Sequence, residues 1–325
     1  MKQTLITLRN NNGMQVVVSD FGARLCSIIF STCHGPKEML MRYQDESQFF
    51  SDPFYVGAIC GRVANRIGRG RFSYDGQTYQ YSQNDGEHCL HGGEQSIDKR
   101  FWQIAEKSHS SVTLTLRSED GDNGFAGNVN IQVTYRLYED NKLEIEICAH
   151  TDKTTPLNLT NHAYFNLAEH SALDLELCID AESVLEKDAG NIPTGKLLKV
   201  DNSELTVPIF DFREPKQLQQ AFESRLMSRG LDHYFTFHKE PNGVRLVAQL
   251  ISKSNSVRMS VFSDQNGLQC YMGGFLSAPF AAYSGVCLEL HNYPDALNHE
   301  QFDSILVQPD QQYKNTMILS FIELE

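Results

Sequence analysis

Apolar and polar residues alternate with a period of two in five stretches, which are residues 112–116, 131–137, 143–147, 173–179 and 286–290. A period of two places successive side chains on opposite faces of an extended chain. The pattern therefore predicts a half-buried β-strand in each stretch.

Clusters of Gly, Asn and Asp at 119–124 and 138–142 separate some of these stretches and favour hairpin connections. Helical spacing is clearest at Leu218, Phe222 and Leu226, where it predicts one short surface helix. Many strands and few short helices indicate a mostly β protein, a large antiparallel β-sandwich. Because no repeat, linker or shift in composition interrupts the chain, we expect a single domain over residues 1–325.

Composition narrows the class of partner. The chain has 28 basic and 41 acidic residues, and a net charge of −13 repels a phosphate backbone, so we expect no nucleic-acid partner. Apolar runs of about 18 residues, as a membrane span needs, are absent, and we expect no membrane partner. The eight scattered cysteines fit reduced thiols in a cytoplasmic protein. Oligomeric state is not predicted.

A histidine lies in an unusual polar and aromatic setting at residues 158–167, NLTNHAYFNL. Asn and Thr hydrogen-bond imidazole or sugar hydroxyls, and Tyr164 and Phe165 offer flat faces for a pyranose ring. His162 is thus a candidate acid or base, although a satisfied core histidine is the alternative.

Two further histidines, His88 and His91, occur in residues 87–93, EHCLHGG. The spacing is compatible with zinc, but no nearby cysteine or carboxylate completes a tetrahedral set, so we expect no metal. The paired glycines allow the backbone to bend or to approach a ligand closely. A turn with solvated histidines is the alternative.

Four arginines, at 62, 66, 69 and 71, follow Gly61 closely and suggest anion binding or a solvated loop. No phosphate-binding glycine pattern accompanies them, whereas the Asn65-Arg66 pair offers donors suited to vicinal sugar hydroxyls. In residues 286–291, alternation directs Glu289 away from the apolar face of its strand. A strand carboxylate is normally solvated and inert, so this position alone leaves catalysis open.

Taken together, these segments resemble the aldose 1-epimerase (galactose mutarotase) family. The resemblance runs in order from about residue 5 to 325, through GRVANRI, LHGG, TNHAYFNL, FDFR at 210–213, LDH at 231–233 and YPDALN. It implies a galactose mutarotase-like β-sandwich that interconverts the α and β anomers of a free aldose without a cofactor. It also implies that His162 is the general acid and Glu289 the general base.

The resemblance further implies sugar-binding roles, which fall on Asn65, Arg66, His91, Asp232 and Gln269. This chain departs from the family's more usual residues at other positions, which are His88, Phe125-Ala126-Gly127, Met272, Gly274 and Leu290-His291. These departures bear on which sugar is preferred and leave the acid–base pair intact.

Anomer exchange requires a base at the anomeric hydroxyl and an acid at the ring oxygen. We therefore expect partial burial to raise the pKa of Glu289 and expect His162 to carry a proton when the sugar binds. Two alternatives stay open: an enzyme acting on a sugar phosphate, for which the arginines argue, and a non-catalytic carbohydrate-binding sandwich.

Overall fold

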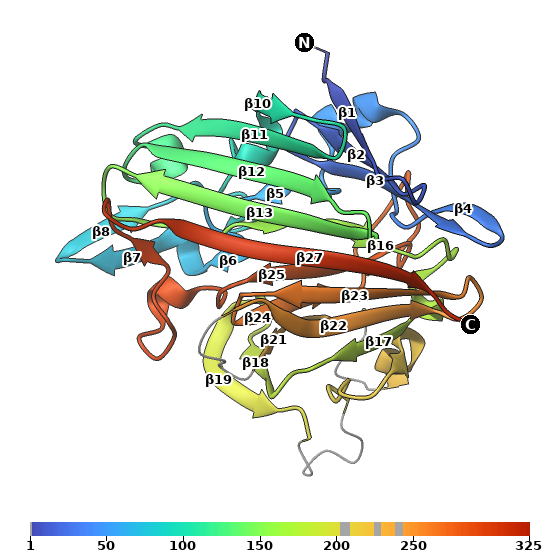
Figure 1. Ribbon diagram of the computed structural model, residues 1–325. Coiled ribbons are helices and arrows are strands. Elements are labelled where there is room, and N and C mark those ends of the chain that lie inside the picture. Colours follow the sequence, from blue (N-terminus) through green and yellow to red (C-terminus); the bar gives the residue numbers. More distant parts are fainter. Residues whose placement is uncertain (1, 202–208, 224–228, 238–242) are drawn as a thin grey trace.

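A nine-stranded antiparallel sheet spans the molecule in the computed structural model, which describes residues 2–201, 209–223, 229–237 and 243–325. Figure 1 shows this sheet from β10 at the top to β17 near the bottom. Its strands, in spatial order, are β10 (Gln103–Lys107), β11 (Ser111–Ser118), β12 (Val129–Leu137), β13 (Lys142–Thr151), β27 (Tyr313–Glu323), β23 (Val257–Ser263), β22 (Arg245–Ser252), β17 (Glu176–Ile179) and β20 (Lys216–Gln217).

A six-stranded antiparallel sheet packs behind the first and carries most of the chemistry described below. Its order is β16 (Tyr164–Phe165), β25 (Val286–His291), β24 (Gly267–Tyr271), β21 (Asp232–Thr236), β18 (Ser183–Lys187) and β19 (Pro193–Lys199). Apolar residues of both sheets form one core; Ile145 and Leu319 of the large sheet meet Leu268 and Leu288 of the smaller one in it. The predicted mostly β sandwich is confirmed.

Smaller elements surround the two sheets. One four-stranded sheet contains β1 (Leu5–Arg9), β2 (Gln15–Ser19), β3 (Leu25–Thr32) and β4 (Gly35–Glu38). The two-stranded pairs are β5 (Ile59–Cys60) with β15 (Thr160–Asn161), β6 (Arg66–Ile67) with β9 (Cys89–Leu90), β7 (Arg71–Tyr74) with β8 (Gln77–Gln80), and β14 (Thr155–Pro156) with β26 (Leu306–Val307).

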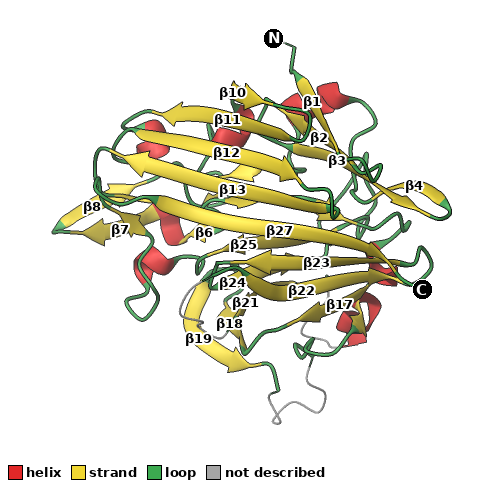
Figure 2. Cartoon of the chain, viewed as in Figure 1, coloured by secondary structure: helices red, strands yellow, loops and turns green. Residues whose placement is uncertain are grey.

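The helices of the described residues are short 3-10 turns at the ends of strands (Figure 2). They are η1 (Glu46–Ser51), η2 (Gly68–Gly70), η3 (Ile97–Lys99), η4 (Asp122–Gly124), η5 (Ala172–Asp174), η6 (Leu218–Glu223) and η8 (Ala296–Asn298). The expected short surface helix is present over Leu218–Glu223 as a 3-10 helix, with Gln219 and Gln220 exposed and Leu218 and Ala221 buried against the core. Leu226 lies outside the described residues.

Two of the strand predictions need correction. Leu173 belongs to η5, and the strand begins only at Glu176, because a 3-10 turn precedes it. All six residues of β25 are buried, so this strand is not half-buried. Val286, Leu288 and Leu290 face the core as expected, but the opposite face is covered by other segments instead of by water.

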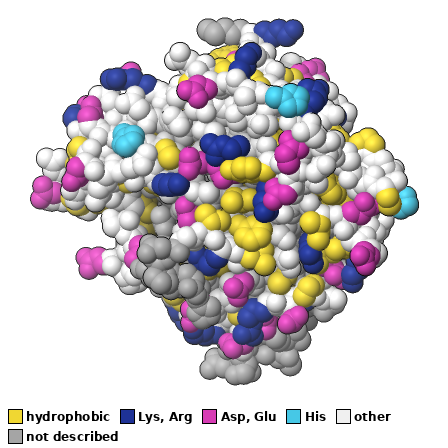
Figure 3. Space-filling view, in the orientation of Figure 1, with side chains coloured by type: hydrophobic (Ala, Val, Ile, Leu, Met, Phe, Trp, Pro, Cys, Tyr) yellow, Lys and Arg dark blue, Asp and Glu magenta, His cyan; other side chains and the backbone are white. Residues whose placement is uncertain are grey.

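The outward face of the large sheet is mixed in character, with apolar side chains among acidic and basic ones (Figure 3). Leu246 pairs with Phe262, and Phe262 pairs with Ile318, so three apolar residues form a row across β22, β23 and β27. All eight cysteines are free, as expected for reduced thiols. Within the described residues, no helix has the length and apolar character that crossing a membrane requires.

Candidate active site

Three polar side chains meet because their strands are neighbours in the six-stranded sheet. Gln269 of β24 lies directly opposite Glu289 of β25, and Asp232 begins the next strand, β21. Cross-strand partners place their side chains on the same face of a sheet. Gln269 Nε2 accordingly donates a hydrogen bond to Asp232 Oδ1 at 2.7 Å. Residues distant in the sequence thus share one polar surface.

His162 reaches the same surface from the segment between β15 and β16. Tyr164 of β16 pairs with Cys287 of β25, which sets the register that brings the imidazole over the strand. His162 Nε2 lies 3.6 Å from Glu289 Oε1, and its Nδ1 is 3.5 Å from Cys287 Sγ. Both His162 and Glu289 are almost fully buried, with exposed fractions of 4% and 2%.

Asn65 and His91 lie next to the paired strands β6 and β9 and are joined by two hydrogen bonds. His91 N donates to Asn65 O at 3.1 Å, and Asn65 N donates to His91 Nδ1 at 3.2 Å. The turn is tight enough that a Cβ at Gly92 would lie 1.9 Å from Gly61 O, which explains a glycine there. The side-chain amide of Asn65 then donates to Gln269 Oε1 at 3.1 Å and joins both clusters.

A cavity of about 410 Å³ has all seven sequence-predicted site residues in its lining. The polar part of the lining also includes Asp85 and Asn191; Arg66 Nε donates a hydrogen bond to Asp85 Oδ2 at 2.7 Å. The aromatic part, called the aromatic wall below, consists of Phe54, Tyr55, Tyr164, Tyr271 and Phe275. A pocket with hydrogen-bonding groups beside aromatic rings suits a pyranose, which has hydroxyls at its edge and C–H groups on its faces.

Burial sets the protonation of the acid–base pair. It raises the pKa of Glu289 well above the usual carboxyl range, with the charge of Asp232 adding to the rise and Arg66 opposing it. Burial also lowers the pKa of His162 to about 4, against smaller opposing effects of a backbone hydrogen bond and of Asp52. The expected rise at Glu289 is confirmed. In the sugar-free site desolvation disfavours the imidazolium, and the expectation that His162 carries a proton when the sugar binds stays a prediction.

His91, His162 and Glu289 form a group whose possible ligand atoms lie within 4.8 Å of one another. Two histidines and one carboxylate are a set that transition metals can use. However, His91 Nδ1 accepts a hydrogen bond from Asn65 N, so in the neutral ring Nε2 carries the proton. A protonated Nε2 donates instead of binding a metal, and His91 therefore favours a sugar oxygen in the cavity.

The remaining residues of the arginine and histidine motifs lie outside the cavity, and two of them bind other parts of the chain through hydrogen bonds. Of the four arginines, all in the described part of the chain, only Arg66 lines the cavity. Arg62 is buried and bonds to Ser118, Glu119 and Ala126 on the connection between β11 and β12. His88 Nδ1 accepts a hydrogen bond from Arg69 N. The positions where the chain departs from the family's usual residues, among them Met272, Gly274, Leu290 and His291, are likewise outside the cavity lining.

Some residues in or next to the cavity carried no signal in the sequence. Lys187 Nζ donates to the backbone oxygen of Asp232 at 2.5 Å and lies 3.3 Å from its Oδ2, and it lines a smaller neighbouring pocket together with Arg66. Together Lys187 and Arg66 hold the pKa of Asp232 below its usual value although burial opposes them. The aromatic wall at residues 53–55 was missed as well, because no spacing rule connects it with His162.

Comparison with known proteins identifies the family of this chain. The family model described as Aldose 1-epimerase matches residues 4–320. The aldose 1-epimerase of Escherichia coli is 34% identical over 98% of this chain and 95% of its own length, and the galactose mutarotase of Rattus norvegicus is 36% identical over 82% and 79%.

Solved structures give the same result. An aldose epimerase homologue from C. elegans superposes with a TM-score of 0.92 at 26% identity, covering all of both chains. A galactose 1-epimerase from Lactobacillus acidophilus gives 0.88 at 27% identity, covering 100% of this chain and 96% of its own. The chain therefore belongs to the aldose 1-epimerase family, the carbohydrate isomerases that interconvert the α and β anomers of aldoses.

Proposed function

We propose that Glu289 and His162 are the acid–base pair with which this aldose 1-epimerase opens and recloses the ring of a free aldose. The observation that carries the proposal is one buried carboxylate and one buried imidazole 3.6 Å apart at the wall of a sugar-sized cavity. Glu289 Oε2 is buried and has no hydrogen-bond partner among the described residues. A sugar hydroxyl in the cavity supplies the missing partner.

The reaction needs two proton transfers and no change in oxidation state. Glu289, as carboxylate, takes the proton of the anomeric hydroxyl while His162, as imidazolium, gives one to the ring oxygen, and the bond between that oxygen and the anomeric carbon breaks. Rotation in the open aldehyde exposes the other carbonyl face, and reclosure reverses both transfers. General acid–base assistance of this type typically contributes about 10²–10⁴-fold.

The protonation states of the sugar-free site fit this cycle at one particular point. Burial raises the carboxyl pKa and lowers the imidazole pKa, so it favours the uncharged forms of both groups, a protonated Glu289 and a neutral His162. That is the state the pair reaches once the ring has opened. To open a pyranose, the same proton must first move to His162, and sugar hydroxyls entering a dry site stabilise the charged form that burial disfavours.

Sugar binding falls to the other five residues in this proposal. Gln269, Asp232 and Asn65 form a hydrogen-bonded chain whose remaining donors and acceptors face the cavity. Arg66 and His91 add donors near the acid–base pair, where they favour negative charge on oxygen. Arg66 supports a sugar phosphate less than a free hexose, because its guanidinium already pairs with Asp85.

The cellular setting is part of the same proposal. Eight free cysteines are typical of a reducing compartment, which supports a cytoplasmic enzyme. A net charge of −13 supports a small neutral substrate over nucleic acid.

Polarimetry on freshly dissolved α-D-glucose and α-D-galactose tests the proposal. We expect the wild-type protein to accelerate mutarotation and expect Glu289→Gln and His162→Asn each to remove the acceleration with the fold intact. His88→Asn is the matched control, since His88 is outside the cavity, and it should retain wild-type rates. Equal buffer-rate relaxation for wild type and both variants would refute the assignment. Competition by hexose 6-phosphate but not by free hexose would instead favour a phosphorylated substrate.

A further inference from the structure

The aromatic wall of the cavity has a strained backbone. Pro53, Phe54 and Tyr55 line the cavity, and the Tyr55 ring lies 4.6 Å from the His91 ring and 5.8 Å from the His162 ring, centre to centre. Tyr55 has a φ of +58°, in the left-handed region that non-glycine residues seldom adopt. Such a conformation persists only where its surroundings hold it.

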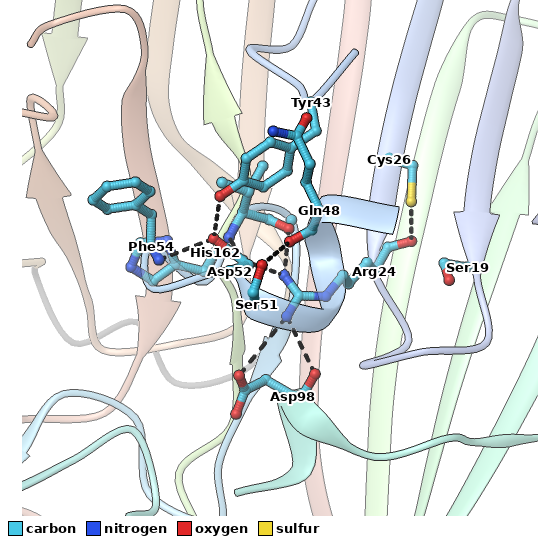
Figure 4. Close-up of polar contacts among 12 residues, drawn as sticks. Ser19, Arg24, Cys26, Tyr43, Gln48, Ser51, Asp52, Phe54, Asp98 and His162 are labelled. Atoms are coloured by element: carbon cyan, nitrogen blue, oxygen red, sulfur yellow. Dashed lines mark hydrogen bonds and ion pairs between the residues drawn. The ribbon is translucent and has the colours of Figure 1, made fainter. Parts of the chain in front are cut away.

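A buried carboxylate, that of Asp52, binds the backbone on both sides of Tyr55; Figure 4 shows Asp52 among Tyr43, Phe54 and Arg24. Asp52 Oδ1 accepts hydrogen bonds from Phe54 N and from the Tyr43 hydroxyl, both at 2.9 Å. Asp52 Oδ2 accepts one from Val56 N at 2.7 Å. The amides just before and just after Tyr55 thus bind the same side chain.

Arg24 fixes that carboxylate in turn. Its Nη1 donates to Asp52 Oδ2 at 2.6 Å and to Val56 O at 2.8 Å, and its Nη2 donates to Asp98 O at 3.2 Å. The side chains of Arg24 and Asp52 are 1% and 0% exposed. The guanidinium therefore connects the wall segment to the neighbouring η3 turn through groups that water does not reach.

The same segment also holds the backbone of His162. Gly57 N donates to His162 O at 3.0 Å, and His162 N donates to Ala58 O at 2.9 Å. One continuous stretch, residues 52–58, therefore contributes Phe54 and Tyr55 to the aromatic wall and also supports the backbone of His162.

We propose that Arg24 and Asp52 are positioning residues. They hold the 52–58 segment, and with it Phe54 and Tyr55 of the aromatic wall, in the conformation that binds the sugar. This proposal rests on the function proposed above. Neither residue lines the cavity, so both act through Phe54, Tyr55 and Val56. Stability alone is a poor explanation for the pair. Apolar residues of similar size often replace a buried ion pair with no loss of stability.

The test is the double variant Arg24→Met with Asp52→Leu, made in an Asp98→Asn background because Asp98 Oδ2 lies 3.8 Å from Arg24 Nη2 and its buried carboxylate loses that cation in the double variant. We expect the KM for galactose and glucose to rise about tenfold or more, equivalent to about 1.4 kcal/mol of lost binding at tenfold. The kcat should stay within about threefold, because Gly57 and Ala58 keep their hydrogen bonds to the His162 backbone and the aromatic residues contact the sugar in ground and transition states alike. The thermal midpoint should remain close to that of Asp98→Asn alone.

Two comparisons separate positioning from a general structural role. Arg62→Met removes a guanidinium that is equally buried and makes three hydrogen bonds, to the end of β11 and to its connection with β12. This variant should leave KM unchanged, whatever its effect on the thermal midpoint. In a Tyr55→Ala background, the double replacement should add little to KM, since the ring that it positions is already gone.

If the double variant fails to fold, Asp52→Asn gives the same answer at smaller scale. Its amide oxygen still accepts from Tyr43 and Phe54, but its Nδ2 cannot accept from Val56 N or from Arg24 Nη1, so KM should rise about threefold. A wild-type KM in either folded variant, or an equal KM increase in Arg62→Met, overturns the positioning role. The proposed function fails separately, by absence of catalysed mutarotation in the wild-type protein.

Discussion

Replacing Glu289 with Gln should move activity and stability in opposite directions. Gln has nearly the same shape but cannot act as a base at neutral pH, so we expect catalysed mutarotation to fall by about 10²–10⁴-fold. The fold should become more stable at the same time. The carboxyl group is 2% exposed, its Oε2 has no hydrogen-bond partner among the described residues, and burial raises its pKa.

The sign and size of the stability change follow from linkage. The carboxyl of Glu289 has an unfolded pKa of 4.5 and a higher pKa in the folded protein. Such a carboxyl destabilises the fold, and the destabilisation grows as pH rises from 4.5 to the folded pKa. Each unit of the rise costs about 1.4 kcal/mol. With about 2.1 cal/mol/K of unfolding entropy per residue, a chain of 325 residues gains about 1.5 °C in Tm per kcal/mol, or about 2 °C per pKa unit.

Differential scanning calorimetry of both proteins at pH 7.5 and pH 4, beside polarimetry at pH 7.5, measures the two effects. At pH 7.5 the Glu289→Gln variant should have the higher Tm. Near pH 4 the carboxyl is protonated in folded and unfolded states alike, so the difference should disappear. The reasoning is refuted if the variant has the lower Tm at both pH values, because desolvation then does not dominate at this site. Retained activity would separately refute the base assignment.

Three further outcomes are expected. Burial lowers the pKa of His162 from 6.5 to about 4, so the wild type should lose stability relative to His162→Asn as pH falls from 6.5 toward 4. Urea midpoints of both proteins measure this, and a stability difference that does not change with pH would contradict it. Lys187→Met should raise KM, and more at lower pH, because Asp232 loses a cation that lowers its pKa; a pH-independent KM would argue against that. An aromatic disulfide reagent should quickly label Cys33 alone in the native protein, because Cys33 is the exposed cysteine, and activity should be retained. Rapid reaction of several thiols would contradict the burial of the other cysteines.

The sequence alone determined the fold class and the types of chemical group. Alternation located β11, β12, β13 and β25, because side chains of a strand point to alternate faces whatever its neighbours are. It also directed Glu289 away from the core correctly. Local composition marked His162 and the tight turn at Gly92, since both depend on nearby residues.

Tertiary structure decided which of these groups meet and in what state of charge. Sheet register, which no local pattern specifies, placed Gln269 beside Glu289 and brought Tyr164 and His162 onto β25. The same packing covered the outer face of β25 and so made a half-buried strand fully buried. Desolvation depends on every segment that surrounds a side chain, and for that reason the neutral state of His162 and the contribution of Lys187 became evident only in three dimensions.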